Sequence, residues 1–302
     1  MGSIVAFVNM KGGVGKTTTT INLAACLAKD YNKRVLIVDL DSQINATLSL
    51  MSPVQFAKLK KDHKTLRNLV KQSVSKQTKP RWAPTEIIQT NLCGINGLDI
   101  LPGDIELYED FVLADIIYER SQGKRDNFLE CWQEMEDNLL KQILRPLAPM
   151  YDFVLLDFSP GDHLMTRSGI LASDYYVIPA KPEPLSVVGI GILQGRIKQF
   201  KDNQRSTIEL LGITFTSLGR TTKMAGQVQE RLERDFGKTS LFRTAIPINV
   251  AIARAVDFYK PVVLTEPKST GAKAYKRLAN EFLYRWQQHI KVPDSPKPEA
   301  ES

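Results

Sequence analysis

The stretch Ile4-Val-Ala-Phe-Val-Asn9, followed by Met10-Lys-Gly-Gly-Val-Gly-Lys-Thr-Thr18, decides the fold of this chain. Its first part is a short apolar run that ends at glycines, as buried strands do. From Gly15 apolar residues recur at helical spacing until about Asn32, and Arg34-Val-Leu-Ile-Val-Asp39 is again a continuous apolar run. This strand–helix–strand order predicts two parallel strands in a sheet that is buried on both faces.

The alternation of apolar runs and helical stretches continues through the rest of the chain. It predicts a doubly wound α/β fold, with a mostly parallel sheet and helices on both faces. We expect one domain over 1–290, with elaborations near 52–92 and 120–145 and a disordered tail at 291–302. Further strands are expected near 98–101, 153–157, 175–179, 211–215 and 242–246, and helices near 66–76, 128–145, 185–201, 224–236, 249–258 and 271–289.

The loop after the first strand predicts a phosphate-binding site. Gly12, Gly13 and Gly15 let the backbone curl, so that successive N–H groups can cradle a triphosphate at a helix N-terminus. Lys16 would neutralise the phosphate oxygens, and the Thr17 hydroxyl would ligate Mg²⁺. A glycine-rich turn capped by threonines is the alternative, but the position between an apolar strand and an amphipathic helix favours a phosphate loop.

The composition is that of a globular protein, with 302 residues, 43% of them hydrophobic and 24% charged. No run approaches the roughly 20 apolar residues that span a bilayer, and no signal peptide opens the chain. The 3 cysteines and 3 histidines are scattered, which gives neither a disulfide framework nor a metal-site spacing. We therefore expect a cytoplasmic protein whose only metal is an ion bound with the nucleotide.

The phosphate loop departs from the general pattern, because Met10 stands where glycine is usual and a second lysine, Lys11, precedes the glycine pair. In this respect Lys11-Gly-Gly-Val-Gly-Lys-Thr-Thr18 resembles the deviant phosphate loop of the ParA/MinD group of ATPases. The Asn-Met-Lys-Gly-Gly opening is more similar to ParA/Soj proteins than to MinD. Three more stretches resemble the family's motifs in the family's order: Val38-Asp-Leu-Asp-Ser-Gln43, Tyr151-Asp-Phe-Val-Leu-Leu-Asp157 and Ile246-Pro-Ile-Asn-Val250.

The carboxylates in these motifs have roles that the residues and the resemblance imply together. Asp157 ends an apolar strand beside the loop, where it can hold Mg²⁺ through water or merely cap the strand. Asp41 lies where the family orients the attacking water. Asp39 can support magnesium or cap a turn.

The resemblance thus implies a P-loop ATPase that uses ATP and Mg²⁺. The implied catalytic residues are Lys11, Lys16 and Asp41, and the implied metal ligands are Thr17, Asp41 and Asp157. The implied nucleotide-binding residues are Lys11, Gly12, Gly13, Val14, Gly15, Lys16, Thr17, Thr18, Pro247 and Asn249.

The charge of +7 is unevenly distributed along the chain. Residues 1–200 carry 23 basic and 22 acidic side chains, whereas 201–290 carry 15 and 8. Basic side chains without base-reading geometry suit sequence-independent contact with phosphates, so 201–290 is the expected DNA-binding region. The run 58–81 holds nine basic residues, and 99–137 holds twelve acids that either meet a basic partner peptide or face solvent.

In the family, the first lysine of the loop, here Lys11, reaches across a dimer to the other subunit's phosphates. The resemblance implies a nucleoid-associated homodimer that forms on ATP and binds DNA non-specifically. A ParB-like or other adaptor triggers hydrolysis, and the cycle segregates or positions a plasmid, a chromosome region or a protein assembly.

Other functions stay open at this point. A MinD-like ATPase on a membrane surface would use the amphipathic stretch 274–290, without stable insertion, although such a helix usually packs on its own sheet. An ATP-dependent enzyme acting on a small molecule, or a nucleotide sensor without catalysis, would share the phosphate loop. A reductase like the nitrogenase iron protein would need cluster cysteines, and no suitable pair is present.

Overall fold

The computed structural model describes residues 2–74, 82–109, 117–118, 121–122, 124–217, 219 and 223–291. Six strands form one sheet in the order β3-β2-β4-β1-β5-β6, and every neighbouring pair is parallel. This confirms the predicted doubly wound α/β fold. The strands are β1 (Ser3–Phe7), β2 (Val35–Leu40), β3 (Leu98–Leu101), β4 (Phe153–Phe158), β5 (Tyr175–Ala180) and β6 (Glu209–Phe215).

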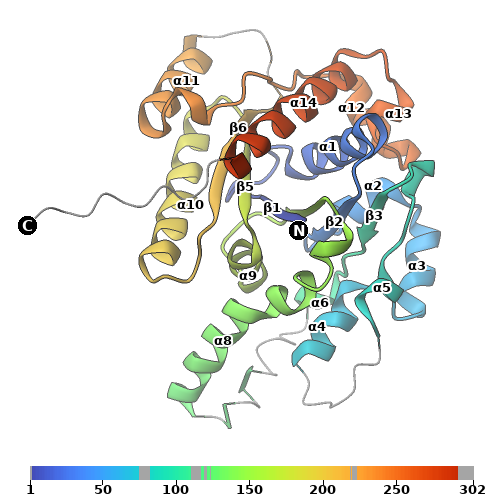
Figure 1. Ribbon diagram of the computed structural model, residues 1–302, viewed down its shortest axis with the longest axis vertical. Helices are drawn as coiled ribbons and strands as arrows, with labels where there is room; N and C mark the ends of the chain where they lie inside the picture. The colour runs from blue at the N-terminus through green and yellow to red at the C-terminus, as the bar shows by residue number, and fades with distance from the viewer. Residues whose placement is uncertain are drawn as a thin grey trace, which may run out of the picture.

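Helices cover both faces of the sheet, as Figure 1 shows. On one face α4, α8, α9, α10 and α11 close a core over alternate strand residues such as Ile4 and Val38. On the other face α1, α2, α3, α12, α13 and α14 close a second core over residues such as Val5 and Ile37. The central strands are therefore buried on both sides, which explains their continuous apolar runs.

The six helices predicted after α1 correspond to α4, α8, α10, α11, α12 with η4, and α14, whereas α2, α3, α9 and α13 were not predicted. The longest ones are α1 (Lys16–Tyr31), α8 (Arg125–Leu144), α10 (Pro184–Asp202), α11 (Lys223–Phe236) and α14 (Thr270–Lys291). Medium and short helices are α2 (Asn45–Leu50), α3 (Pro53–Lys61), α4 (Leu66–Val74), α5 (Pro84–Ile87), α6 (Glu106–Glu109), α9 (Leu164–Ala172), α12 (Val250–Ala255) and α13 (Val262–Thr265). The 3-10 turns are η1 (Leu92–Gly94), η2 (Ala148–Met150), η3 (Lys238–Ser240) and η4 (Val256–Phe258).

The segment 242–246, expected as a strand, is not a strand. Only its first and last N–H groups reach β6. Between them, the N–H groups of Arg243 and Thr244 donate to the carboxylate of Glu281, at 2.8 and 2.9 Å. The guanidinium of Arg285 donates to the carbonyls of Thr239 and Leu241, just before the segment. Side chains of α14 thus occupy the backbone groups that a strand would pair, so the prediction was wrong.

Helix α14 lies beside α1 over the sheet (Figure 1) and uses its apolar face there. Tyr275, Leu278 and Phe282 are each 1% exposed. The indole of Trp286 donates to the Ser3 hydroxyl at 2.8 Å. The apolar side of the amphipathic stretch 274–290 therefore packs against the protein's own core. Lys291 ends α14, and the rest of the expected tail lies outside the described residues.

Candidate nucleotide site

The phosphate loop connects β1 to α1 and is shaped by two glycines. Gly13 and Gly15 have φ angles of 68° and 80°, in the left-handed region that glycine tolerates best. Gly15 is the N-cap of α1, so the helix begins inside the loop. The carbonyl of the buried Val14 accepts a 2.6 Å hydrogen bond from the hydroxyl of Thr216, just after β6. The first N–H groups of α1 have no intrahelical partner and can receive an anion.

Lys16 lies inside this loop, only 6% exposed. Its Nζ donates to the carbonyls of Asn9 and Lys11, at 3.2 and 3.0 Å. Burial lowers the pKa of Lys16, while the nearby charges of Asp157 and Asp41 oppose that shift. The structure therefore brings the predicted lysine and the two predicted carboxylates together.

Asp157 stands at the end of β4, fully buried. Neither of its carboxylate oxygens has a hydrogen-bond partner of normal geometry in the part of the chain that the structure describes, although the Thr17 hydroxyl lies near enough to lower its pKa. Burial, followed by the charge of Asp39, raises its pKa well above the ordinary value. A buried carboxylate without partners is costly unless a cation accompanies it, so this residue fits a metal-binding role better than a strand cap.

Asp39 is the direct neighbour of Asp157 in the sheet, but its oxygens are occupied. Its Oδ2 accepts from the N–H and hydroxyl of Thr47, both at 2.7 Å, and its Oδ1 accepts from the N–H of Asp41 at 3.1 Å. Burial raises the pKa of Asp39 to about 6. Of the two open readings, the structure favours the cap: Asp39 fixes the turn into α2.

Asp41 is held at the mouth of the site, 5% exposed. Its Oδ1 accepts from the N–H of Gln43 at 3.1 Å, and its Oδ2 accepts from the side-chain amide of Asn45 at 2.7 Å. These bonds fix the carboxylate just after β2, near enough to Lys16 for its negative charge to raise the pKa of that lysine. A carboxylate fixed in this way can orient a water molecule without being a strong base.

The residues present fit Mg²⁺ of the kind that accompanies a nucleotide. Among the described residues no group of three or more His, Cys, Asp or Glu is placed to hold a metal ion. Mg²⁺ bound with a nucleotide needs only one or two protein ligands, because phosphate oxygens and waters supply the others. The half-buried Thr17 is the second residue of α1 and lies close to the buried Asp157, so these two are the candidate ligands, while a metal-binding role for Asp41 stays a prediction.

Lys11, the second lysine of the loop, has a different side-chain partner from Lys16. Its ammonium forms an ion pair with the carboxylate of Glu183, the N-cap residue of α10. Its N–H donates to the side chain of Asn9 at 3.0 Å, and that amide in turn donates to the Pro179 carbonyl at 2.8 Å. Sequence reasoning missed Glu183, whose only signal was its place between prolines at the start of a predicted helix.

The loop after Asp157 is fastened to α10 as well. Asp162 accepts hydrogen bonds from Arg167 of α9, at 2.8 and 3.0 Å, and from Arg196 of α10, at 3.0 and 2.5 Å. Burial opposes the effect, but these two guanidinium groups hold the pKa of Asp162 below its ordinary value. One helix, α10, therefore contacts both Lys11 and the loop that follows Asp157.

Pro247 and Asn249 lie at the start of α12. Asn249 is the N-cap of that helix, and its side chain accepts from the N–H of Ala251 at 2.9 Å. The same side chain donates to the hydroxyl of Thr270, at the start of α14, at 2.6 Å. These bonds go to α12 and α14 rather than to the phosphate loop, so a nucleotide contact by these two residues stays a prediction.

The charged runs differ in how much of their charge is free. In 58–81, Lys60 and Arg67 pair with Glu106, whereas Lys58 and Lys64 form no ion pair within the described ranges. Glu130 of 99–137 is exposed and forms no ion pair within the described ranges, whereas five other described acids of this run bond inside the chain. Those acids are Asp99, Asp104, Glu106, Glu136 and Asp137.

Comparison with known proteins supports the assignment of a nucleotide-binding site. Residues 2–210 match the AAA domain family. The chain is 32% identical over 281 residues to the sporulation initiation inhibitor protein Soj of Bacillus subtilis, covering 93% of this chain and 98% of that protein. It is also 32% identical over 284 residues to the chromosome-partitioning ATPase Soj of Thermus thermophilus, covering 94% and 96%.

Solved structures extend the comparison to the fold. The structure of apo McdA from Cyanothece matches with a TM-score of 0.73 and 18% identity, covering 94% of this chain and 100% of that one. The chain thus belongs to the AAA domain family and, within it, to the ParA/Soj type of P-loop ATPase. It is an ATPase, as the deviant phosphate loop predicted. No helix in the described ranges is both long enough and apolar enough to cross a membrane.

Proposed function

We propose that this ATPase dimerises on ATP, binds DNA without sequence preference while dimeric, and releases it when a partner protein triggers hydrolysis. The observation that carries the proposal is that the loop has a second lysine, Lys11, in addition to the phosphate-site residues Lys16, Thr17, Asp41 and Asp157. A chain that only had to bind a nucleotide would not need a second lysine there.

Each residue of the site has a task in this proposal. Lys16 neutralises phosphate charge that grows in the transition state. Thr17 and Asp157 would hold the Mg²⁺ that accompanies ATP, and the ion would neutralise phosphate charge. Asp41, fixed by Asn45, orients the attacking water.

Lys11 would act on the nucleotide of a second subunit. In the single chain its ammonium is held by Glu183, at the N-terminus of α10. To serve another subunit it must leave that partner, so breaking the ion pair accompanies dimer formation. Nucleotide shared between two subunits would make ATP a ligand of the dimer and shift the equilibrium toward it.

The DNA surface would lie on α11, η3 and the exposed side of α14. Arg254 and Lys276, two of the expected basic residues, already pair with Glu266 and Asp30, and Arg220 lies outside the described residues. On α11, η3 and α14 and at residue 243, the exposed basic side chains without an ion pair in the described ranges are Lys223, Arg234, Lys238, Arg243, Lys273 and Arg277. Such a cluster suits phosphate contacts rather than base reading.

A partner on the cargo would stimulate hydrolysis, and the resulting gradient would segregate or position a plasmid, a chromosome region or a protein assembly. The names of the Soj relatives support chromosome partition, and McdA supports the fold. While dimeric, the protein would be found on the nucleoid in the cytoplasm. A MinD-like membrane role is disfavoured because the apolar face of α14 is buried in the core.

The test is DNA binding by the ATP-bound protein across a salt series. We expect binding of duplex DNA only with ATP, with an affinity that falls steeply as salt rises. Arg234→Glu with Lys238→Glu should reduce it, while Lys58→Glu with Lys61→Glu, on exposed positions of α3, should change it little. DNA binding that does not depend on ATP, or that does not depend on salt, would contradict the proposal.

A further inference from the structure

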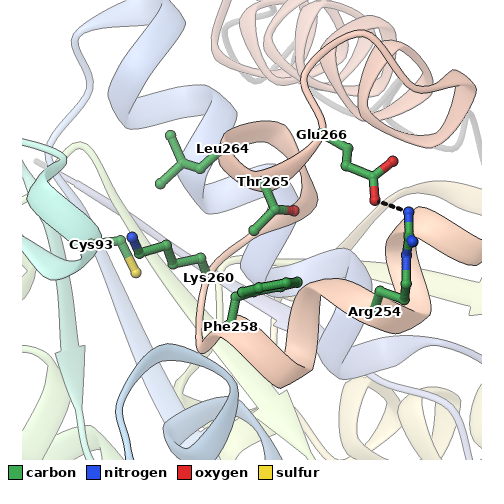
Figure 2. Close-up of a pocket in the computed structure, with 7 residues that line it drawn as sticks. All are labelled: Cys93, Arg254, Phe258, Lys260, Leu264, Thr265 and Glu266. Carbon is green, nitrogen blue, oxygen red and sulfur yellow. Dashed lines mark hydrogen bonds and ion pairs between the residues drawn. The ribbon is translucent and has the colours of Figure 1, made fainter.

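A groove lies on the side of the molecule where strand β3 ends the sheet, away from the phosphate loop. Three cavities of about 630, 620 and 430 Å³ meet there, and Cys93 of η1 lines all three. We call this surface the Cys93 groove. Figure 2 draws its first cavity, with Phe258, Lys260 and Leu264 around the opening and the Arg254–Glu266 pair at one side.

Basic side chains dominate the rim of the Cys93 groove. Seven lysines and arginines line the three cavities, against two acids, Asp62 and Glu266. Glu266 is already neutralised, because Arg254 holds it at 2.5 Å. Four of the basic groups form no ion pair with any residue that the structure describes. These four are Lys33, Lys58, Lys64 and Lys260.

Apolar side chains form the walls between these charges. Leu50, Met51 and Leu59 line the second cavity, and Leu264 lines the first and third. Phe258 is 60% exposed at the first cavity. Exposed apolar surface rimmed by charge marks an interaction site.

The groove is reached by short helices that come from the nucleotide site. Helix α2 begins at Asn45, which holds Asp41, and ends at Leu50 in the groove. Helix α12 begins after its N-cap Asn249 and carries Arg254 at the groove. The turn η4, which carries Phe258, contacts α2. An occupant of the groove would therefore press on elements that place Asp41.

We infer that the Cys93 groove binds an extended acidic segment of a partner protein, in which apolar side chains alternate with Asp or Glu. Free lysines on the rim would meet the carboxylates, and the apolar walls would take the apolar side chains. Duplex DNA fits less well, because a rigid rod with polar phosphates cannot place apolar groups into cavities of this size. The inference goes beyond the proposed function, since the groove contains none of the residues assigned to the nucleotide and none of the six free basic residues proposed to contact DNA.

The test is binding of a labelled peptide of about twelve residues, with Glu and Leu in alternation, to the full chain. Fluorescence anisotropy without nucleotide keeps the result independent of the ATPase cycle. We expect saturable binding. Lys58→Glu with Lys260→Glu should weaken it about tenfold, from roughly 1.4 kcal/mol for two reversed rim charges. Phe258→Ala should weaken it several-fold.

Matched variants control for total charge and for loss of an exposed aromatic ring. Lys198→Glu with Lys201→Glu, on exposed positions of α10, and Tyr284→Ala, at 62% exposure on α14, should leave the affinity unchanged. Equal loss in both lysine pairs, or no saturable binding, overturns the inference. So does a groove that binds duplex DNA in place of the peptide, or one that mediates self-association on a sizing column.

Discussion

The phosphate site and the Cys93 groove are both built from charged side chains, but those of the phosphate site are buried and those of the groove are exposed. At the phosphate site Lys16, Asp39 and Asp157 are almost entirely buried, and burial shifts the pKa of each. In the groove, Lys58 and Lys260 are exposed. Buried charges need a counter-charge at a fixed place, whereas exposed ones need only a partner of opposite sign.

The difference teaches where specificity lies in this molecule. A pocket of buried charges is selective for one ligand geometry, and a substitution there greatly reduces binding or stability. A rim of exposed lysines tolerates substitution and responds to salt. The following experiments test the comparison, beginning with the change expected to have the largest effect.

Substituting Asp41→Ala should reduce ATP hydrolysis by about 100-fold or more, because a positioned carboxylate orients the attacking water. ATP binding should persist, since Lys16 and the loop are untouched. The matched change in the groove, Asp62→Ala, should leave hydrolysis unchanged. Phosphate release and nucleotide binding, measured side by side, check both; normal turnover in the Asp41 variant would remove this residue from the mechanism.

Asp39 should make stability depend on pH in an unusual direction. Its pKa is raised to about 6 in the folded protein, against about 3.9 when unfolded. Between these values the folded state holds the proton and the unfolded state does not, so the Asp39 contribution to the free energy of unfolding rises as pH falls from about 6 to about 4. The gain is at most ~3 kcal/mol.

Denaturant titrations at several pH values, on the natural chain and on Asp39→Asn, measure that contribution. An amide keeps only one acceptor oxygen, so the variant changes the hydrogen bonds around Asp39 as well as its charge, and its absolute stability differs at every pH. The comparison is therefore made between slopes. The natural chain should gain stability relative to the variant as pH falls through this window; parallel curves would mean that Asp39 does not titrate there.

Lys11→Ala should weaken ATP-dependent dimerisation by roughly tenfold or more, since charge-assisted hydrogen bonds contribute about 1.5–3 kcal/mol each. Lys58→Ala in the groove is the control and should leave the dimer intact. Sedimentation with ATP, over a range of protein concentrations, gives both constants. An unchanged ATP-bound dimer in the Lys11 variant would refute action on a second subunit.

The smallest effect is expected from Glu183→Gln, which releases Lys11 within its own chain. The ion pair is half-exposed, so its loss should favour the ATP dimer by only about two- to fivefold. Glu266→Gln breaks a comparably exposed pair at the groove and should not affect dimerisation. If both variants, or neither, shifted the dimer constant, the Lys11–Glu183 pair would have no part in dimer formation.

The contrast between the two regions also explains which features could be predicted from the sequence. The phosphate loop is continuous in sequence, and Asp41 and Asp157 each follow an apolar strand, so parallel pairing alone predicts that they meet at one edge. The strand 242–246 was mispredicted because its competitors, Glu281 and Arg285, lie on a helix some forty residues later. Nothing local distinguishes a segment that pairs from one whose backbone is captured by side chains.

The sequence by itself determined the doubly wound sheet, the loop between β1 and α1, and the identity of the ATPase family. These depend on local spacing and on short motifs whose geometry the backbone enforces. Tertiary structure alone decided that Glu183 holds Lys11, that Thr216 braces the loop, and that lysines from three distant segments surround Cys93. Such contacts are chosen by the packing of whole elements, and no short stretch of sequence encodes that packing.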